Sequence, residues 1–216
     1  MQMLEVFAEV ACPFAHAGLA RFAEFRDDHG LTAPVLRVRA WPLELVNGAP
    51  FDGLALVPKV EALRAEVAPG LFGGFDPGRF PATSLPALIA EAAAYRAGNQ
   101  AGETFSLVLR RALFDDGKDV SDPEVLRRLR ASCDVDEPSP ADETAVRADL
   151  ADGRRRGVKG SPHFFTAEGD FFCPSLRIEH DDSGYDVSFD AVGFERFIAA
   201  AFASATPEKG TRSTLS

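Results

Sequence analysis

The residues best suited to chemistry stand in VACPFAHAGLARF, residues 10–22, where an apolar strand is expected to give way to a helix that opens at Pro13. Cys12 directly precedes that helix. A thiol there faces unpaired N–H groups and the positive end of the helix dipole, which lower a cysteine pKa from its free value of about 8.5. His16, one turn further on the same face, is suited to act as a cation or proton shuttle. The stretch leaves two interpretations open: a reactive thiolate, or a small buried core residue.

A second candidate element is GVKGSPHFF, residues 157–165, where Ser161 and Pro162 lead from a glycine-punctuated loop into an apolar strand. A proline that opens a strand is sometimes cis, but only about 5 to 6% of X–Pro bonds in folded proteins are. The stretch by itself therefore favours a trans turn. His163 follows directly, and it suits either a hydrogen-bonded structural histidine or a residue of a site.

The elements that position these residues begin with a strand, a helix and a second strand. MLEVFAEV has strand composition and starts the fold at Met3 or Leu4. The helix from Pro13 stops at Gly30. VLRVRAWPL alternates apolar residues with arginines, which is the period of a strand. The first 50 residues therefore predict a βαβ unit.

Residues 51–135 predict a helical insertion, because they contain no strand candidate. Pro58 is expected to open a first helix, which Pro69 stops. The loop LFGGFDPGRFPATS should be irregular and anchored by its aromatic side chains. Three helices follow, in LPALIAEAAAYRAG, ETFSLVLRRALFDDG and SDPEVLRRLRASC. The last begins with a capping box formed by Ser121 and Glu124, with a proline in its first turn.

After residue 135 the pattern returns to α/β. Ser139 is expected to cap a further helix that has a proline at its first position. HFFTAEGDFFCP and LRIEHDDSGYDVSF each predict a hairpin, the first turning near Glu168-Gly169 and the second near Ser183-Gly184. FERFIAAAF predicts a last amphipathic helix, and residues 204–216 a disordered polar tail.

This order of elements resembles the thioredoxin fold. More narrowly, it is similar to the DsbA family in its cytoplasmic branch, which includes FrnE-like oxidoreductases and 2-hydroxychromene-2-carboxylate isomerases. The resemblance covers most of the chain and is carried by CPFAHAGLARF, RVRAWPLELV, LFDDGKDVSDPEVL and GVKGSPHFF. It implies an α/β thioredoxin-like domain of residues 1–50 and 136–203, with residues 51–135 as a helical insertion domain between the second strand and the cis-proline strand.

The resemblance also implies roles for the two candidate stretches. Pro162 would be cis, and Ser161 would face the nucleophilic sulfur of Cys12. Family oxidoreductases resolve a mixed disulfide with a second cysteine at the position that Ala15 occupies here, so a disulfide across this turn is excluded. The isomerase branch usually has serine in place of Cys12 and uses glutathione as cofactor. The sequence lies between the two branches.

The candidate site therefore consists of a catalytic pair and a set of binding residues. Cys12 is the expected nucleophile and His16 its proton shuttle. Four aromatic residues either line an apolar cleft above the thiol or belong to the core: Phe14, Trp41, Phe72 and Phe75. The expected binding residues are Pro13, Phe14, Trp41, Ser161, Pro162 and His163.

Composition limits the partners. The 33 acidic and 23 basic residues give a net charge of -10, which argues against a nucleic-acid surface. The basic run GRRRGVKG fits cations at a helix C-terminus. No apolar run approaches the roughly 18 residues of a membrane span, and MQMLEVFAEV lacks the features of a signal peptide. We therefore expect a cytoplasmic protein without a membrane partner.

Three widely separated cysteines do not form a disulfide framework. In the expected reducing compartment they would be free thiols. Cys133 ends an insertion helix and Cys173 is expected on a far hairpin, so both are interpreted as core residues and neither as an evident substitute for the missing second cysteine.

Three functions of different classes fit these observations. The first is a monothiol thiol-disulfide oxidoreductase, in which Cys12 attacks a small-molecule or protein disulfide and an external low-molecular-weight thiol, glutathione or an analogue, resolves the product. The second is a glutathione-type thiol-dependent isomerase or transferase. The third is a non-catalytic binding protein on a thioredoxin scaffold. No metal and no tightly bound cofactor is expected. Relatives in the isomerase branch are often dimers, so the resemblance is compatible with a homodimer, although no feature of the sequence marks an interface.

Overall fold

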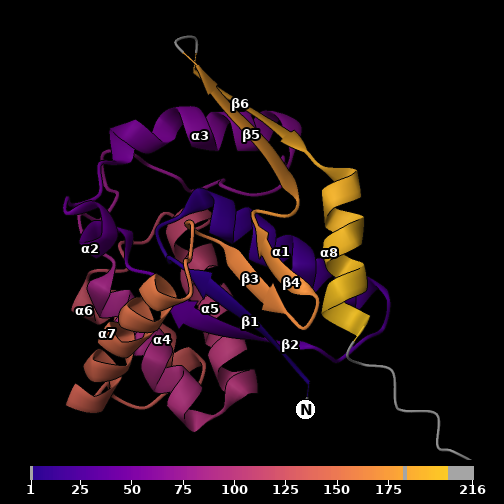
Figure 1. Cartoon of the computed structure of the whole chain (residues 1–216). Helices are drawn as coiled ribbons and strands as arrows, with labels where there is room; N and C mark the ends of the chain where they lie inside the picture. Colours follow the sequence, from indigo (N-terminus) through magenta and orange to yellow (C-terminus); the bar gives the residue numbers. More distant parts are fainter. Residues whose placement is uncertain (1, 182–183, 204–216) are drawn as a thin grey trace, which may run out of the picture.

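The computed structural model describes residues 2–181 and 184–203, which are built around a four-stranded sheet (Figure 1). Its strands are β1 (Met3–Ala8), β2 (Val35–Ala40), β3 (His163–Thr166) and β4 (Gly169–Phe172), in the order β2-β1-β3-β4. β1 and β2 are parallel, whereas β3 runs antiparallel to β1 and β4 to β3. The predicted βαβ unit and the first predicted hairpin are both confirmed.

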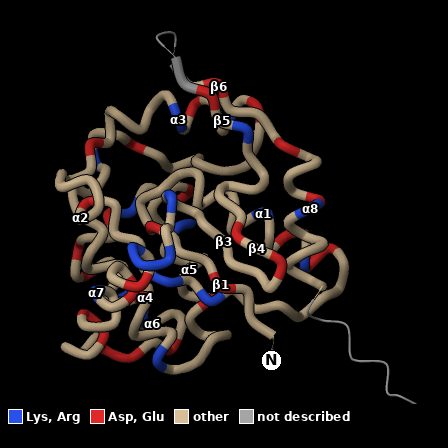
Figure 2. Tube along the Cα trace, in the orientation of Figure 1, with Lys and Arg blue, Asp and Glu red and all other residues tan. Residues whose placement is uncertain are grey.

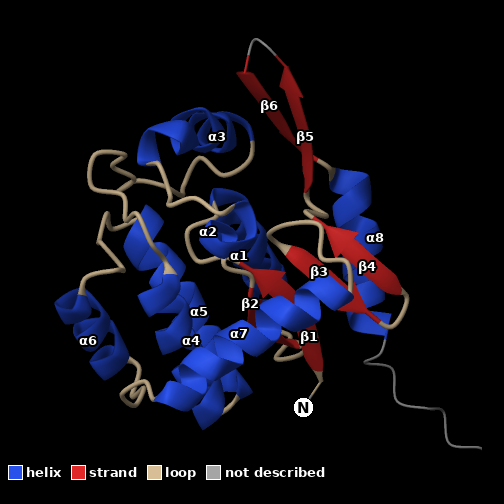
Figure 3. Cartoon of the chain, turned by 60° about the vertical axis from the view of Figure 1, so that its left-hand side comes forward, coloured by secondary structure: helices blue, strands red, loops and turns tan. Residues whose placement is uncertain are grey.

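Helices cover both faces of the sheet (Figure 3). Alternate residues of β1 are directed to opposite faces. Val6 belongs to the core cluster of α1 (Pro13–Asp28) and α8 (Ala191–Ala203), and Phe7 packs with Trp41 and Leu150 of α7 (Pro140–Arg155) on the other side. The central strand β1 is thus covered on both sides.

The helical insertion lies between β2 and β3, as expected. A short helix that the sequence did not predict precedes it, and four longer helices form it. These are α2 (Leu43–Asn47), α3 (Gly53–Glu66), α4 (Leu85–Ala97), α5 (Asn99–Phe114) and α6 (Pro123–Ser132). The loop before α4 is anchored by aromatic rings: Phe75 packs edge to face on Phe80 and stacks on Phe114.

Two expected helix starts are wrong. Pro58 lies inside α3, which begins a turn earlier because the Asp52 side chain accepts a hydrogen bond from the Leu54 N–H. α6 is capped by Asp122, whose carboxylate accepts from the N–H groups of residues 124 and 125, and not by Ser121. In both cases the aspartate directly before the first helical residue supplies the acceptor that the first turn needs.

The second predicted hairpin forms a separate two-stranded sheet, β5 (Leu176–Asp181) and β6 (Gly184–Phe189), which packs against α3 (Figure 1). The Lys59 amine of α3 lies 5.1 Å from the ring centre of Tyr185. The turn expected near Ser183 and the tail expected at residues 204–216 fall outside the described residues.

Charged residues of both signs are distributed over the whole trace (Figure 2). The basic run does occupy a helix C-terminus, since Arg154 and Arg155 stand in the last turn of α7. Arg156, which follows, binds the Glu5 carboxylate at 2.7 Å and so ties α7 to β1. No helix of residues 2–181 and 184–203 has the length and apolarity that crossing a membrane requires.

The open edge of β2 is closed by a tyrosine from the insertion. The Tyr95 hydroxyl accepts a hydrogen bond from the Val38 N–H at 2.9 Å and donates one to the Leu36 carbonyl at 3.0 Å. The side chain therefore occupies the hydrogen-bonding position of a fifth strand and protects an edge that would otherwise be free to pair.

We expect Tyr95→Phe to lower the free energy of unfolding by about 1–3 kcal/mol, because it leaves a buried donor and acceptor unpaired. Urea denaturation measures this change. Glu124→Ala, which breaks an exposed ion pair with Arg127, is the control. A Tyr95→Phe protein as stable as the wild type would contradict the edge-closing role.

Candidate active site

Cys12 is the N-cap residue of α1. Its backbone is extended (φ -94°, ψ 117°), and its carbonyl accepts the first helical hydrogen bond, from the His16 N–H at 3.0 Å. The thiol therefore lies beside the unpaired N–H groups of the first turn, as the sequence predicted. Pro13 occupies the first helical position, where its missing N–H costs nothing.

The Ser161–Pro162 loop lies directly against this thiol. β3 pairs antiparallel with β1, with Phe7 opposite His163, so the residues before β3 meet the chain that leaves β1. The Ser161–Pro162 bond is cis, as the family resemblance implied. The Cys12 thiol donates a hydrogen bond to the Ser161 carbonyl at 3.1 Å.

Glu9, which no pattern in the sequence singles out, organises the surroundings of Cys12. Its fully buried carboxylate accepts hydrogen bonds from the Ala11 N–H at 3.0 Å and the Leu43 N–H at 2.8 Å. Its own N–H donates to the Ser161 hydroxyl at 2.9 Å. One residue thus joins the turn before Cys12, the start of α2 and the cis-proline loop.

The electrostatics of Cys12 differ from the expectation. Burial raises the pKa of the thiol above its usual value, because the side chain is almost wholly shielded from water. The nearby Ala15 and Phe14 N–H groups and the Ser161 side chain lower the pKa, but they do not outweigh burial, and the Glu9 charge raises it further. The expected net lowering of the pKa is therefore wrong for this conformation.

We expect Glu9→Gln to lower the pKa of Cys12, because the change removes a charge that opposes the thiolate. At pH 8, alkylation of Cys12 by iodoacetamide should become severalfold faster, whereas Glu5→Gln, in the strand β1 that precedes Glu9, should leave the rate unchanged. The measurement is the alkylation rate against pH, with the modified peptide identified by mass. A slower or unchanged rate in Glu9→Gln would show that its charge does not control the thiol.

His16 is buried, but its imidazole is engaged elsewhere. Its Nε2 lies 2.9 Å from an Asp115 carboxylate oxygen, and its ring stacks on Phe114 and meets Phe72 edge to face. In the described part of the chain no hydrogen bond joins this imidazole to the Cys12 sulfur. Burial raises the pKa of Asp115, but the hydrogen bond and the charge of His16 hold that pKa below its usual value. His16 therefore anchors the insertion to α1 in this conformation.

His163 is a neutral, hydrogen-bonded histidine directed away from the thiol. The Lys159 N–H donates to Nδ1 at 3.1 Å, so the proton is on Nε2, which donates to Asp170 at 2.7 Å. Burial lowers the pKa of His163, although the neighbouring Asp170 acts in the opposite direction. The structural interpretation of His163 fits these contacts.

The aromatic residues proposed for a cleft are distributed over different parts of the core. Trp41 packs edge to face on Phe7, with 6.2 Å between the ring centres, in the cluster that also contains Leu150 of α7. Cys12 belongs to a different cluster. Phe72 is fully buried against His16, and Phe75 packs within the insertion. Of these four aromatic residues, Phe14 is the one that is both partly exposed and packed against the cluster that contains Cys12.

The other two cysteines have different surroundings. Cys133 is the C-cap residue of α6, as expected, and is partly exposed. Cys173 is buried, but the expectation that it lies on a far hairpin is wrong, since its sulfur is 3.8 Å from the same Ser161 carbonyl that Cys12 binds. Ala15, at the second-cysteine position, is fully buried.

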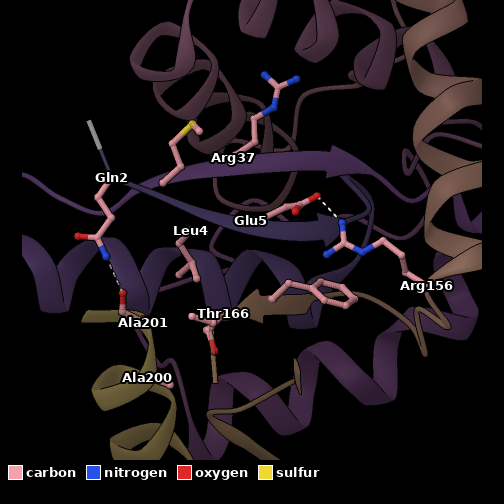
Figure 4. A pocket seen from close by; sticks show the side chains of 11 residues that line it. Gln2, Leu4, Glu5, Arg37, Arg156, Thr166, Ala200 and Ala201 are labelled. Carbon is pink, nitrogen blue, oxygen red and sulfur yellow. Dashed lines mark hydrogen bonds and ion pairs between the residues drawn. The ribbon is translucent and has the colours of Figure 1, made fainter. Parts of the chain in front are cut away.

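A cavity of about 370 Å³ opens at the opposite end of β1 (Figure 4). Glu5, Arg37, Arg156 and Thr166 are among its lining residues, and the Gln2 side chain donates to the Ala201 carbonyl. It lies where β1 begins, whereas Cys12 follows the end of that strand. The cavity is thus separate from the candidate active site.

A thiol at the start of the first helix, facing a cis proline before the third strand, defines a thioredoxin-fold protein of the DsbA type. The chain belongs to the DSBA-like thioredoxin domain family, whose model matches residues 3–183. This confirms the predicted α/β fold with a helical insertion after β2. No curated protein matches the chain in sequence.

Several solved structures share the fold. A probable DsbA oxidoreductase from Streptomyces coelicolor superposes with a TM-score of 0.64 at 19% identity, over 98% of this chain and 94% of that one. The cytosolic disulfide reductase DsbM from Pseudomonas aeruginosa, solved with GSH, gives 0.58 at 18% identity, over 78% and 88%. A 2-hydroxychromene-2-carboxylate isomerase gives 0.57 at 15%, over 79% and 88%.

Proposed function

We propose that this protein is a thiol-disulfide oxidoreductase that works through the single nucleophile Cys12. The observation that carries the proposal is the contact between the Cys12 thiol and the Ser161 carbonyl of the cis-proline loop, at the N-terminus of α1. The helix N–H groups stabilise the thiolate, and the loop holds a substrate sulfur next to it.

The reaction consists of two exchanges that balance. The Cys12 thiolate attacks one sulfur of a disulfide R–S–S–R, forms Cys12–S–S–R and releases RS⁻. An external thiolate then attacks the R sulfur of this mixed disulfide, which frees Cys12 as the thiolate and leaves a new disulfide in solution. Because Ala15 replaces the usual second cysteine, the external thiol supplies the second sulfur.

Glutathione or an analogue is the proposed external thiol. The presence of GSH in the DsbM structure supports this choice, as that protein has the same fold. We further propose a small-molecule or protein disulfide as substrate, a cytoplasmic location, and a place near the FrnE-like and isomerase branches of the family. The three free cysteines support a reducing compartment. A homodimer remains the proposed assembly.

A second candidate, a thiol-dependent isomerase or transferase, is favoured by one observation. Burial raises the pKa of Cys12, so the residue is also suited to orient the sulfur of a bound thiol cofactor without itself exchanging. Tight binding of reduced glutathione by a protein that forms no mixed disulfide would select this function.

The test is a brief incubation with oxidised glutathione, followed by acid quenching and intact-mass spectrometry. At the earliest times the wild type and Cys133→Ser should each carry one glutathionyl group, and Cys12→Ser none. An adduct of equal yield on Cys12→Ser, or no change in the mass of any of the three proteins, would contradict the proposal.

A further inference from the structure

Cys173 lies where the chain leaves β4, directly opposite the cis-proline loop. Its N–H donates to the Pro162 carbonyl at 3.1 Å, which extends the pairing of β3 with β4 by one residue. The residue is only 4% exposed and belongs to the buried core. The position is fixed by the sheet that also fixes Pro162.

The sulfurs of Cys12 and Cys173 converge on one atom. The Ser161 carbonyl oxygen lies 3.1 Å from the Cys12 sulfur and 3.8 Å from the Cys173 sulfur. The two thiols are therefore neighbours, although 161 positions separate them in sequence. Burial raises the pKa of Cys173 well above its usual value, and the adjacent Cys12 charge raises it further.

That charge effect depends on the state of Cys12. While Cys12 is a free thiolate, it opposes ionisation of Cys173. Once Cys12 forms a mixed disulfide its sulfur is neutral, and this opposition ends. Cys173 thus becomes easier to ionise at the step at which a second thiolate is needed.

We propose that Cys173 is the resolving cysteine of this protein, in the role that the residue at position 15 cannot fill. The inference rests on the proposed function and adds an internal step to it. After Cys12–S–S–R has formed, the RS⁻ released in that step takes the proton of Cys173, and the Cys173 thiolate attacks the Cys12 sulfur. The Cys12–Cys173 bond forms, the bond to R breaks, and RS⁻ leaves.

The balance is a two-electron exchange. The substrate disulfide is reduced to two thiols, and the two protein thiols are oxidised to one disulfide. Two molecules of the external thiol then reduce the Cys12–Cys173 bond and become a disulfide themselves. To bond, the two sulfurs leave the shared carbonyl and approach to about 2.05 Å. The turn at Cys173, which has a φ of 45°, joins β4 to β5 and is the part that adjusts.

The test follows the glutathione adduct over time in the full-length protein, by acid quenching, alkylation and non-reducing peptide mapping. In the wild type and the matched control Cys133→Ser, the adduct on Cys12 should give way to a Cys12–Cys173 linked peptide. In Cys173→Ala it should persist, at a level at least about tenfold higher than in the wild type. Circular dichroism verifies the fold of the variant.

Two results would overturn the inference, and they differ in what they imply for the proposed function. A stable Cys12 adduct in the wild type, equal to that in Cys173→Ala and without a linked peptide, overturns the resolving role but leaves the single-cysteine function intact. Absence of both adduct and linked peptide in every variant overturns both. The linked peptide is sought in the wild type, so the result does not depend on the folding of a variant.

Discussion

Cys12→Ser is expected to reduce disulfide turnover to the uncatalysed rate. In an assay in which reduced glutathione drives the reduction of a small disulfide, we expect a loss of at least about 10³-fold, because removing the nucleophile of an enzyme that acts through one removes its covalent route. Serine preserves the size of the side chain and its place at the N-terminus of α1. The loss of turnover would therefore result from the missing nucleophile and not from altered packing.

The matched control is Cys133→Ser, which changes a cysteine at the end of α6 and should retain the wild-type rate. Equal thermal unfolding of the two variants shows that the fold is intact. If Cys12→Ser turned over substrate at the wild-type rate, the protein would be either a binding module or an enzyme of different chemistry.

The second large effect concerns a buried ion pair in the insertion. Glu91 of α4 binds Arg110 of α5 at 2.6 Å, and both side chains are at most 3% exposed. Arg110 also donates to the carbonyl and hydroxyl of Ser106. We expect Glu91→Leu to lower the free energy of unfolding by about 3–5 kcal/mol, because it leaves a buried guanidinium without its counter-charge.

Urea denaturation measures the loss, and the double variant Glu91→Leu/Arg110→Met provides the decisive comparison. With both charges absent, stability should return to near the wild-type value or above it. Glu124→Ala, which breaks an exposed pair with Arg127, should leave the melting temperature almost unchanged. A double variant as unstable as Glu91→Leu would show that packing, and not the unpaired charge, causes the loss.

The sequence was sufficient to predict the meeting of Cys12 with Ser161 and Pro162. Both stretches are continuous motifs next to strand ends, and their order along the chain matches a known family. The cis bond needed that resemblance, since the stretch alone favoured trans. Local pattern and family order together therefore specified the centre of the site.

What the sequence could not show depends on contacts between distant segments. His16 lies on the expected face of α1, but its partner Asp115 is 99 positions away in the insertion. In the sequence, Glu9 is only a polar residue at the end of a strand. Its partner, the Leu43 N–H, belongs to α2, a helix that the sequence did not predict. The lowered thiol pKa followed from the helix terminus alone, and the burial that reverses it is a property of the whole fold.

The most direct test of the central claim is to identify the sulfur that reacts first. The folded wild-type protein is exposed briefly to oxidised glutathione near neutral pH, acid-quenched, digested without reduction and mapped by mass spectrometry. The first glutathionylated peptide should be the one that contains Cys12, with Cys133 unmodified. First modification at Cys133, with Cys12 still a free thiol, would contradict the assignment of Cys12 as the nucleophile.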